Sequence, residues 1–119
     1  LLMKSGEKPF EGYDLSSLRV LGTVGEPISP EAWTWFHRHA GRSQCAVVDT
    51  YWQTETGGHV ITTLPGAHRM KPGSAGLPFF GIEIDVLDST TGAQQQPDED
   101  GNRKGVLVMK SAWPGIART

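Results

Sequence analysis

The residues best equipped for chemistry lie together in one short stretch, Val48-Asp49-Thr50-Tyr51-Trp52-Gln53-Thr54-Glu55-Thr56-Gly57-Gly58. Tyr51 offers a flat face on which a purine base can stack, and Thr50 and Thr54 carry hydroxyls that can donate to phosphate oxygens. Glu55 is a hard oxygen ligand of the kind that Mg²⁺ takes together with substrate phosphates. The combination indicates a nucleotide site, although a polar junction between a strand and a loop explains the composition equally well.

A buried strand leads directly into this stretch. The apolar residues that follow Cys45 predict a strand over residues 45–49. Residues 18–21 predict an earlier strand, which we expect to break at Gly22 and to continue into a loop. Open α/β sheets bind ligands outside the carboxyl ends of their strands, so the polar stretch begins where such sheets place their sites.

A helix is predicted between these two strands, over residues 30–40. Ser29 supplies a hydroxyl N-cap, Pro30 suits the first helical position, and Glu31 adds an acid to the first turn. Gly41 is expected to end the helix. The apolar face of the helix consists of Trp33, Phe36 and Ala40. Strand, helix and strand with short connections predict a βαβ unit with parallel strands.

The second half of the chain has a different character. Residues 59–63 predict one more strand, and residues 71–78 form an expected loop dense in glycine and proline. Residues 82–87 alternate apolar and polar types, which predicts a half-exposed strand. Residues 105–110 predict its antiparallel partner, so this half is expected to contain an antiparallel β-structure with a long polar connection.

The length of 119 residues is enough for about one domain. We divide the chain into an α/β portion over residues 1–64 and the incomplete start of a β-subdomain over residues 65–119. The sequence opens at Leu1 without an initiator Met and stops shortly after Trp113, and we interpret it as an internal segment of a longer protein.

Charge and hydropathy exclude several classes of function. The formal net charge is −2, and no cluster of Lys and Arg indicates a nucleic-acid partner or a membrane surface. No apolar run approaches the roughly 20 residues that a membrane span requires. The single cysteine, Cys45, excludes an internal disulfide and fits a reducing compartment, so we expect a cytoplasmic protein, nucleocytosolic in a eukaryote. Its apolar surroundings predict a core residue rather than a nucleophile.

Tyr51, Thr54 and Glu55 have the spacing of the tyrosine–threonine–glutamate signature of the adenylate-forming enzymes, and the chain resembles this family. Further matching blocks are Val24-Gly25-Glu26-Pro27-Ile28, Lys71-Pro72-Gly73-Ser74-Ala75, Pro78-Phe79-Phe80-Gly81 and Trp113-Pro114-Gly115. These blocks occur in the family's order and extend over nearly all of the chain. The resemblance implies an α/β fold, a fragment of the large N-terminal domain in which a βαβ portion precedes the start of an antiparallel β-subdomain.

The resemblance also implies a role for each matching residue. The implied nucleotide-binding residues are Gly25, Glu26, Pro27, Asp49, Thr50, Tyr51, Trp52, Gln53 and Thr54. Pro27 and Tyr51 would lie on opposite faces of the adenine, and Asp49 would lie near its amino group. Thr54 and Glu55 are the implied catalytic residues, Thr54 near the AMP phosphate and Glu55 as the ligand of Mg²⁺.

Within the family, the stretch from Asp49 to Gly58 resembles the members that activate acetate with ATP and CoA. The implied products are acetyl-CoA, AMP and pyrophosphate, with acetyl-adenylate as the intermediate. Trp52 occupies a position at which many members have glycine, and an indole ring in the carboxylate pocket would restrict the substrate to acetate or propionate. Two alternatives stay open: a propionate ligase with the same chemistry, and a non-catalytic AMP-binding module.

Other residues that the family requires would lie outside this sequence. The phosphate-binding loop with its lysine would precede Leu1. The ribose-binding aspartate, the hinge and the small C-terminal domain with its catalytic lysine would follow Thr119. We therefore expect the 119 residues alone to be inactive, with most contacts to CoA made elsewhere.

Overall fold

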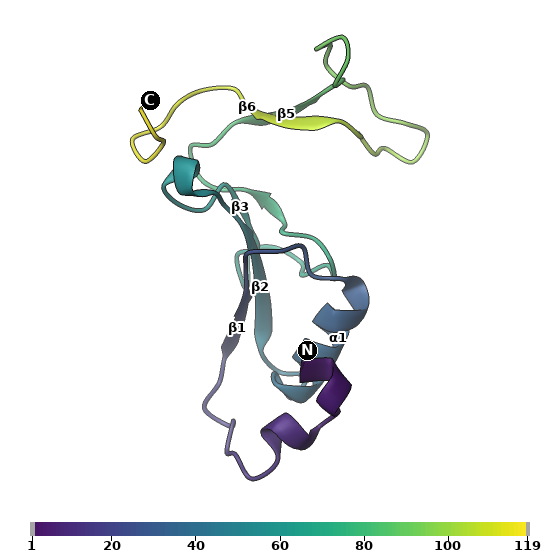
Figure 1. Ribbon diagram of the computed structural model, residues 1–119, viewed down its shortest axis with the longest axis vertical. Coiled ribbons are helices and arrows are strands. Elements are labelled where there is room, and N and C mark those ends of the chain that lie inside the picture. The colour runs from purple at the N-terminus through teal and green to yellow at the C-terminus, as the bar shows by residue number, and fades with distance from the viewer. Residues whose placement is uncertain (1, 119) are drawn as a thin grey trace.

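A helix packed on a parallel pair of strands forms one end of the molecule, and a two-stranded ribbon forms the other (Figure 1). The computed structural model describes residues 2–118. Its strands are β1 (Val20–Thr23), β2 (Ala46–Tyr51), β3 (Ile61–Thr62), β4 (Leu77–Pro78), β5 (Ile84–Leu87) and β6 (Val106–Met109). Its helices are α1 (Pro30–His39) and the 3₁₀ helices η1 (Leu2–Ser5), η2 (Lys8–Phe10) and η3 (Thr54–Thr56). The molecule is elongated, with extents of 53 × 36 × 27 Å.

Helix α1 begins where the sequence predicts. The Ser29 hydroxyl accepts a hydrogen bond from the Ala32 N–H at 3.1 Å, which satisfies one of the free donors of the first turn. The helix ends at His39, and the Ala40 N–H donates to the Phe36 carbonyl at 3.0 Å. Its predicted apolar face is confirmed, because Trp33 and Ala40 are buried and Phe36 packs against them.

Four strands form one sheet in the order β1-β2-β3-β4. β1 and β2 are parallel, and their register places Val20 beside Ala46 and Thr23 beside Asp49. β3 is antiparallel to both of its neighbours, β2 and β4. The predicted βαβ unit is therefore confirmed, and the carboxyl ends of β1 and β2 lie next to each other.

Several strand boundaries differ from the sequence predictions. The predicted break at Gly22 is wrong, because this residue pairs with Val48 in the parallel ladder and glycine retains both backbone hydrogen-bonding groups. β2 continues to Tyr51, where its last residues pair with β3, and β3 is shorter than the predicted strand. β4 lies in the segment predicted as a loop. The sequence does not indicate this strand, because it forms by pairing with β3, and that pairing leaves no local signal in the sequence.

The core lies between α1 and the β1–β2 pair. It consists of Leu21, Trp33, Ala40, Cys45 and Val47, with Phe10, Ile28 and Phe36 packed against it. Cys45 is 3% exposed, which confirms it as a core residue, and its thiol lies 3.2 Å from the Leu18 carbonyl. The Val47 N–H donates to the sulfur of Met70 at 3.1 Å, at a point on β2 that β3 is too short to reach.

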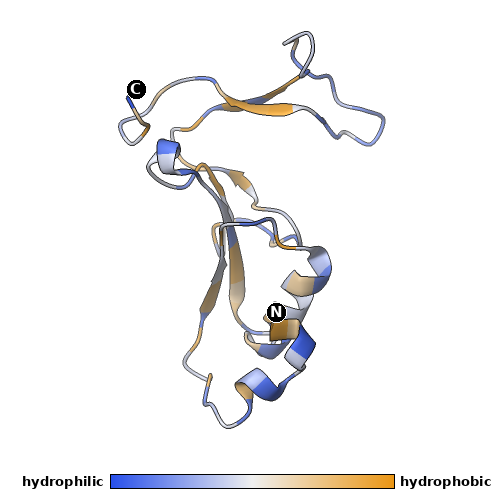
Figure 2. Ribbon diagram, in the orientation of Figure 1, coloured by the Kyte–Doolittle hydropathy of each residue, from blue (hydrophilic) through white to orange (hydrophobic). Residues whose placement is uncertain are grey.

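The ribbon of β5 and β6 is antiparallel, as predicted, with Ile84 opposite Met109 and Leu87 opposite Val106. None of its residues is buried, and Figure 2 shows hydrophobic residues along β6. A two-stranded ribbon is only marginally stable by itself. Hydrogen bonds in the turn after β5 add to the stability of this ribbon. The carboxylate of Asp88 accepts from the N–H groups of two residues in the connecting turn.

The division of the chain at residue 64 stays a prediction. Among residues 2–118, no helix combines the length and hydrophobicity needed to cross a membrane.

Candidate functional site

A hollow of about 420 Å³ opens at the carboxyl ends of β1 and β2. Eight of the predicted site residues line it: Gly25, Glu26, Pro27, Asp49, Thr50, Tyr51, Trp52 and Gln53. Ile61, Gly73 and Ala75 complete the lining. The hollow therefore brings together the loop after β1, the end of β2, β3 and the loop rich in glycine and proline.

Two side-chain hydrogen bonds join the ends of β1 and β2. The Thr23 hydroxyl donates to Oδ1 of Asp49 at 2.7 Å, and the Thr50 hydroxyl donates to the Thr23 carbonyl at 3.0 Å. Asp49 is only 6% exposed, and the hydroxyl donor offsets part of the free-energy cost of burying its carboxylate. Thr23 was not predicted from the sequence, because only the parallel register places it beside Asp49.

The loop after β1 is shaped by Gly25, whose φ of +100° lies in the region that favours glycine. Ile28 packs against the core and holds the far end of the loop, while Glu26 and Pro27 are exposed at the hollow. A Cβ built on Gly73 would lie 3.0 Å from the Pro30 ring, so the second loop approaches the start of α1 closely. The roles predicted for this loop at the adenine and ribose stay predictions.

The two aromatic residues of the site differ in burial. Tyr51 is half-buried, because it ends β2 and pairs with Ile61 of β3. Trp52 follows the strand, lines the hollow and is 45% exposed. Trp52 therefore belongs to the wall of the hollow rather than to the core, while its contact with a substrate stays a prediction.

Thr54 and Glu55, the predicted catalytic residues, do not line the hollow. They begin η3, directly after Gln53, and both are exposed. Thr56, which is 2% exposed, holds this short helix together: its hydroxyl accepts from the Gln53 N–H at 2.9 Å and lies 2.7 Å from the Gln53 carbonyl. The role of Thr56 was also missed, although a threonine three positions after a polar helix start is a capping-box spacing.

A comparison with sequence profiles of protein families identifies the family of this chain. The profile described as AMP-binding enzyme matches residues 1–118. The chain belongs to the AMP-binding enzyme family.

Relatives within this family carry one recurring name. The chain is 61% identical over 110 residues to the acetyl-coenzyme A synthetase of Dictyostelium discoideum, a match that covers 89% of the chain and 16% of the relative. It is 55% identical over 118 residues to the acetyl-coenzyme A synthetase of Drosophila melanogaster, covering 99% of the chain and 17% of the relative. The acetyl-coenzyme A synthetase 1 of Candida albicans is 57% identical over 118 residues, with the same coverage of both chains.

A solved structure confirms the predicted adenylate-forming fold. The crystal structure of the anthranilate CoA ligase AuaEII in complex with anthranoyl-AMP superposes with a TM-score of 0.75 and 27% sequence identity. The match covers 92% of this chain and 19% of that one. The chain therefore spans less than one fifth of the length of these relatives, and of the ligase structure as well.

One exposed carboxylate near the hollow, Glu55, is the candidate ligand for Mg²⁺ in the described part of the chain. Within residues 2–118, no three His, Cys, Asp or Glu side chains gather into a possible metal site. Glu55 is an exposed carboxylate two positions after Gln53, which lines the hollow. Mg²⁺ is commonly held by one or two carboxylates together with substrate phosphates, and an exposed carboxylate such as Glu55 is a ligand of the type that this mode uses. The role of Glu55 as the ligand of Mg²⁺ stays a prediction.

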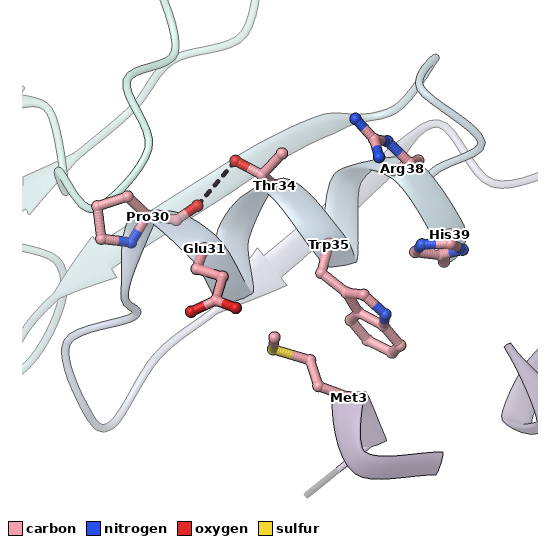
Figure 3. A pocket seen from close by; sticks show the side chains of 7 residues that line it. All are labelled: Met3, Pro30, Glu31, Thr34, Trp35, Arg38 and His39. Atoms are coloured by element: carbon pink, nitrogen blue, oxygen red, sulfur yellow. Dashed lines mark hydrogen bonds between the residues drawn. The ribbon is translucent and has the colours of Figure 1, made fainter. Parts of the chain in front are cut away.

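A second hollow, of about 440 Å³, lies on the outer face of α1 and contains none of the predicted site residues. Figure 3 shows its lining residues, which are Met3, Pro30, Glu31, Thr34, Trp35, Arg38 and His39. The Thr34 hydroxyl donates to the Pro30 carbonyl at 2.8 Å, a contact internal to the helix. The predicted nucleotide-binding residues therefore gather at the hollow at the strand ends and not at this one.

Proposed function

We propose that this chain is part of an AMP-forming acetate–CoA ligase, which converts acetate, ATP and CoA to acetyl-CoA, AMP and pyrophosphate. The observation that carries the proposal is that eight residues of the predicted nucleotide-binding set line one and the same hollow, at the ends of β1 and β2. The names of the relatives, each an acetyl-coenzyme A synthetase, support acetate as the acid.

The first step is the activation of the acid. A carboxylate oxygen of acetate attacks the α-phosphorus of ATP, the bond between that phosphorus and the bridging oxygen breaks, and pyrophosphate leaves with the electron pair. Pro27 and Tyr51 bind the base, and Asp49 accepts from its amino group. Thr54 donates to the phosphate, and Glu55 would hold Mg²⁺, which would stabilise the phosphate charge. The protein contributes positioning and charge stabilisation rather than a covalent nucleophile.

The second step transfers the acyl group. The thiol sulfur of CoA attacks the carbonyl carbon of acetyl-adenylate, AMP leaves from that carbon, and the thiol proton passes to solvent. The residues of this chain hold the AMP portion during the step, while contacts to CoA lie mostly outside it. The α/β portion over residues 1–64 carries the adenylate site in this proposal, and residues 65–119 begin the β-subdomain.

Trp52 sets the size of the acid that is activated. Its indole lines the hollow and is 45% exposed, so a ring is available to close the carboxylate end of the site. In an apolar pocket, the loss of contact with one methylene separates two substrates by only about 1–3 kcal/mol. A rigid ring excludes longer acids more strongly, because their chains would overlap with it. Propionate, one methylene longer than acetate, is the alternative substrate.

A non-catalytic AMP-binding module is the second candidate, and the exposed Thr54 and Glu55 argue against it. These two side chains make no contribution to the core, and they match the tyrosine–threonine–glutamate signature of the family. The proposal takes the substrates to be small molecules, without a nucleic acid or a membrane, and the location to be the cytoplasm.

The deciding experiment is ATP–pyrophosphate exchange by the full-length protein, with acetate, propionate and butyrate in parallel. We expect exchange that depends on acetate and Mg²⁺ and declines as the acid lengthens. Exchange that is faster with propionate than with acetate would identify the propionate ligase. Nucleotide binding without exchange for any of the three acids would identify the binding module.

A further inference from the structure

The segment of residues 113–117 lies against the outside of η3, far from it in the sequence. The indole N–H of Trp113 donates to the Thr56 carbonyl at 3.2 Å, across a separation of 57 positions. The backbone N–H of Ala117 donates to the Glu55 carbonyl at 2.7 Å. Two consecutive carbonyls of η3 are thus bound by one distant segment.

The approach of the two backbones is closer than any side chain would permit. Gly57, which directly follows η3, has a φ of +65°, and a Cβ built on it would overlap the carbonyl group of Gly115. A Cβ built on Gly115 itself would lie 3.4 Å or more from its neighbours, an ordinary contact distance. The segment is therefore seated directly on the turn, at a point where the turn side requires glycine.

The contact acts on a turn that is already held from inside. The Thr56 hydroxyl accepts from the Gln53 N–H at 2.9 Å and lies within 2.9 Å of the carbonyls of Gln53 and Gly58. With its interior bonded in this way and its Glu55 and Thr56 carbonyls bonded from outside, η3 has little freedom to rotate. A short turn held on both sides fixes the direction of its exposed side chains.

We infer that Trp113 is a positioning residue for acid activation: through its hydrogen bond to the Thr56 carbonyl it holds η3, and with it Thr54 and Glu55, in place. The inference rests on the function proposed above for Thr54 and Glu55. Trp113 is not among the residues that line the nucleotide hollow, so it acts through η3 rather than on the substrate. Ala117 contributes the second bond of the same contact.

The alternative is that Trp113 only fills space, since its ring also lines an apolar hollow of about 430 Å³ with Phe79 and Phe80. The two roles depend on different parts of the side chain. Filling space needs the ring, whereas positioning needs the indole N–H. Trp113→Phe retains an aromatic ring and removes the donor, so it separates them.

The test compares Trp113→Phe with the wild-type full-length protein, and Trp35→Phe serves as the matched control because Trp35 lies on the outer face of α1. Three quantities are measured: the equilibrium dissociation constant of ATP with and without Mg²⁺, the rate of ATP–pyrophosphate exchange, and the rate of acetyl-CoA formation from supplied acetyl-adenylate. The midpoint of thermal unfolding is recorded for each variant.

We expect Trp113→Phe to raise the dissociation constant of ATP in Mg²⁺ by about 3- to 10-fold, the loss that one hydrogen bond produces. The increase without Mg²⁺ is expected to be smaller, because Glu55 then has no ion to hold. Exchange slows by a similar factor. The reaction of supplied acetyl-adenylate with CoA slows less, because that step uses Thr54 at the AMP phosphate but has no MgATP for Glu55 to hold, and the unfolding midpoint stays close to that of Trp35→Phe.

Two results would overturn the inference. One is a dissociation constant for ATP in Mg²⁺ within twofold of the wild type. The other is an equal loss in both half-reactions together with a lowered unfolding midpoint, which would assign Trp113 to packing. If Trp113→Phe does not fold, Ala117→Pro removes the second donor of the same contact at an exposed position, and the same two results apply to it. Absence of exchange in the wild type would reject the proposed function, and the comparison of ATP affinities would still decide the inference.

Discussion

The hydroxyl of Thr23 donates to Oδ1 of Asp49 at 2.7 Å, and this bond joins the carboxyl ends of the two parallel strands at the hollow that Asp49 lines. The carboxylate is 6% exposed, so most of its hydration is lost in the folded protein. A buried charged acceptor depends strongly on the donors that remain to it.

Replacing Thr23 by valine, which has nearly the same shape, removes the donor and leaves Oδ1 of Asp49 without it. We expect the free energy of unfolding to fall by about 1–3 kcal/mol, and the affinity for ATP to decrease because the carboxylate is no longer held in one orientation. Denaturant unfolding and nucleotide titration of the full-length protein measure the two effects. Thr34→Val is the matched control, since Thr34 is exposed and its hydroxyl donates to the Pro30 carbonyl within α1. Equal effects of the two substitutions would contradict the prediction.

Trp52→Gly is expected to broaden the range of acids that support ATP–pyrophosphate exchange. Removal of the exposed indole enlarges the hollow at its wall, so propionate and butyrate gain relative to acetate, by up to about 10–200-fold per methylene accommodated. The ratio of kcat/KM values for the three acids is the measurement. Trp52→Phe retains a ring and is expected to keep the preference for short acids. If the ratios are unchanged in Trp52→Gly, the indole does not contact the acid.

The sequence predicts those parts of the fold that local signals specify. Ser29 and Pro30 mark the start of α1 correctly, and the alternation over residues 82–87 leads to the β5–β6 ribbon. The stretch from Asp49 to Gln53, at the end of β2 and just beyond it, identifies five residues that line one hollow, because a strand and the loop that follows it are contiguous in the chain. The other three predicted residues of that hollow, Gly25, Glu26 and Pro27, lie in the loop after β1 and are predicted from the family resemblance.

The features that the sequence does not predict depend on contacts between distant residues. β1 continues through Gly22 because of its register with β2, and β4 exists only because β3 lies beside it. Thr23 becomes important only when the parallel pairing places it beside Asp49. The hydrogen bond from Trp113 to η3 spans 57 positions, and no spacing rule in the sequence connects its two ends.

The turn that begins at Asp88 is expected to loosen in acid. The N–H of Thr91, followed by the N–H of Thr90 and the Thr91 hydroxyl, holds the pKa of Asp88 below its ordinary value of 3.8. Because the pKa is lowered in the folded state, the carboxylate stabilises the turn above pH 3.8, and this contribution is lost as the pH falls through the lowered pKa. Hydrogen exchange at Thr90 and Thr91, corrected for intrinsic rates, should therefore accelerate below that pH. Asp88→Asn should remove most of this pH dependence, and an unchanged profile in the variant would show that another group causes it.

Gly57 and Gly58 are adjacent, but only Gly58 has room for a side chain. Alanine at Gly57 requires a φ of +65° and places its Cβ against the carbonyl group of Gly115, whereas a Cβ on Gly58 meets nothing within 4 Å. Strain at such a position costs about 1–3 kcal/mol, and the overlap adds to it by separating η3 from the 113–117 segment. We expect Gly57→Ala to lower the unfolding midpoint and to slow ATP–pyrophosphate exchange, while Gly58→Ala stays near the wild type in both. Identical behaviour of the two variants would mean that the close approach of Gly115 does not hold η3.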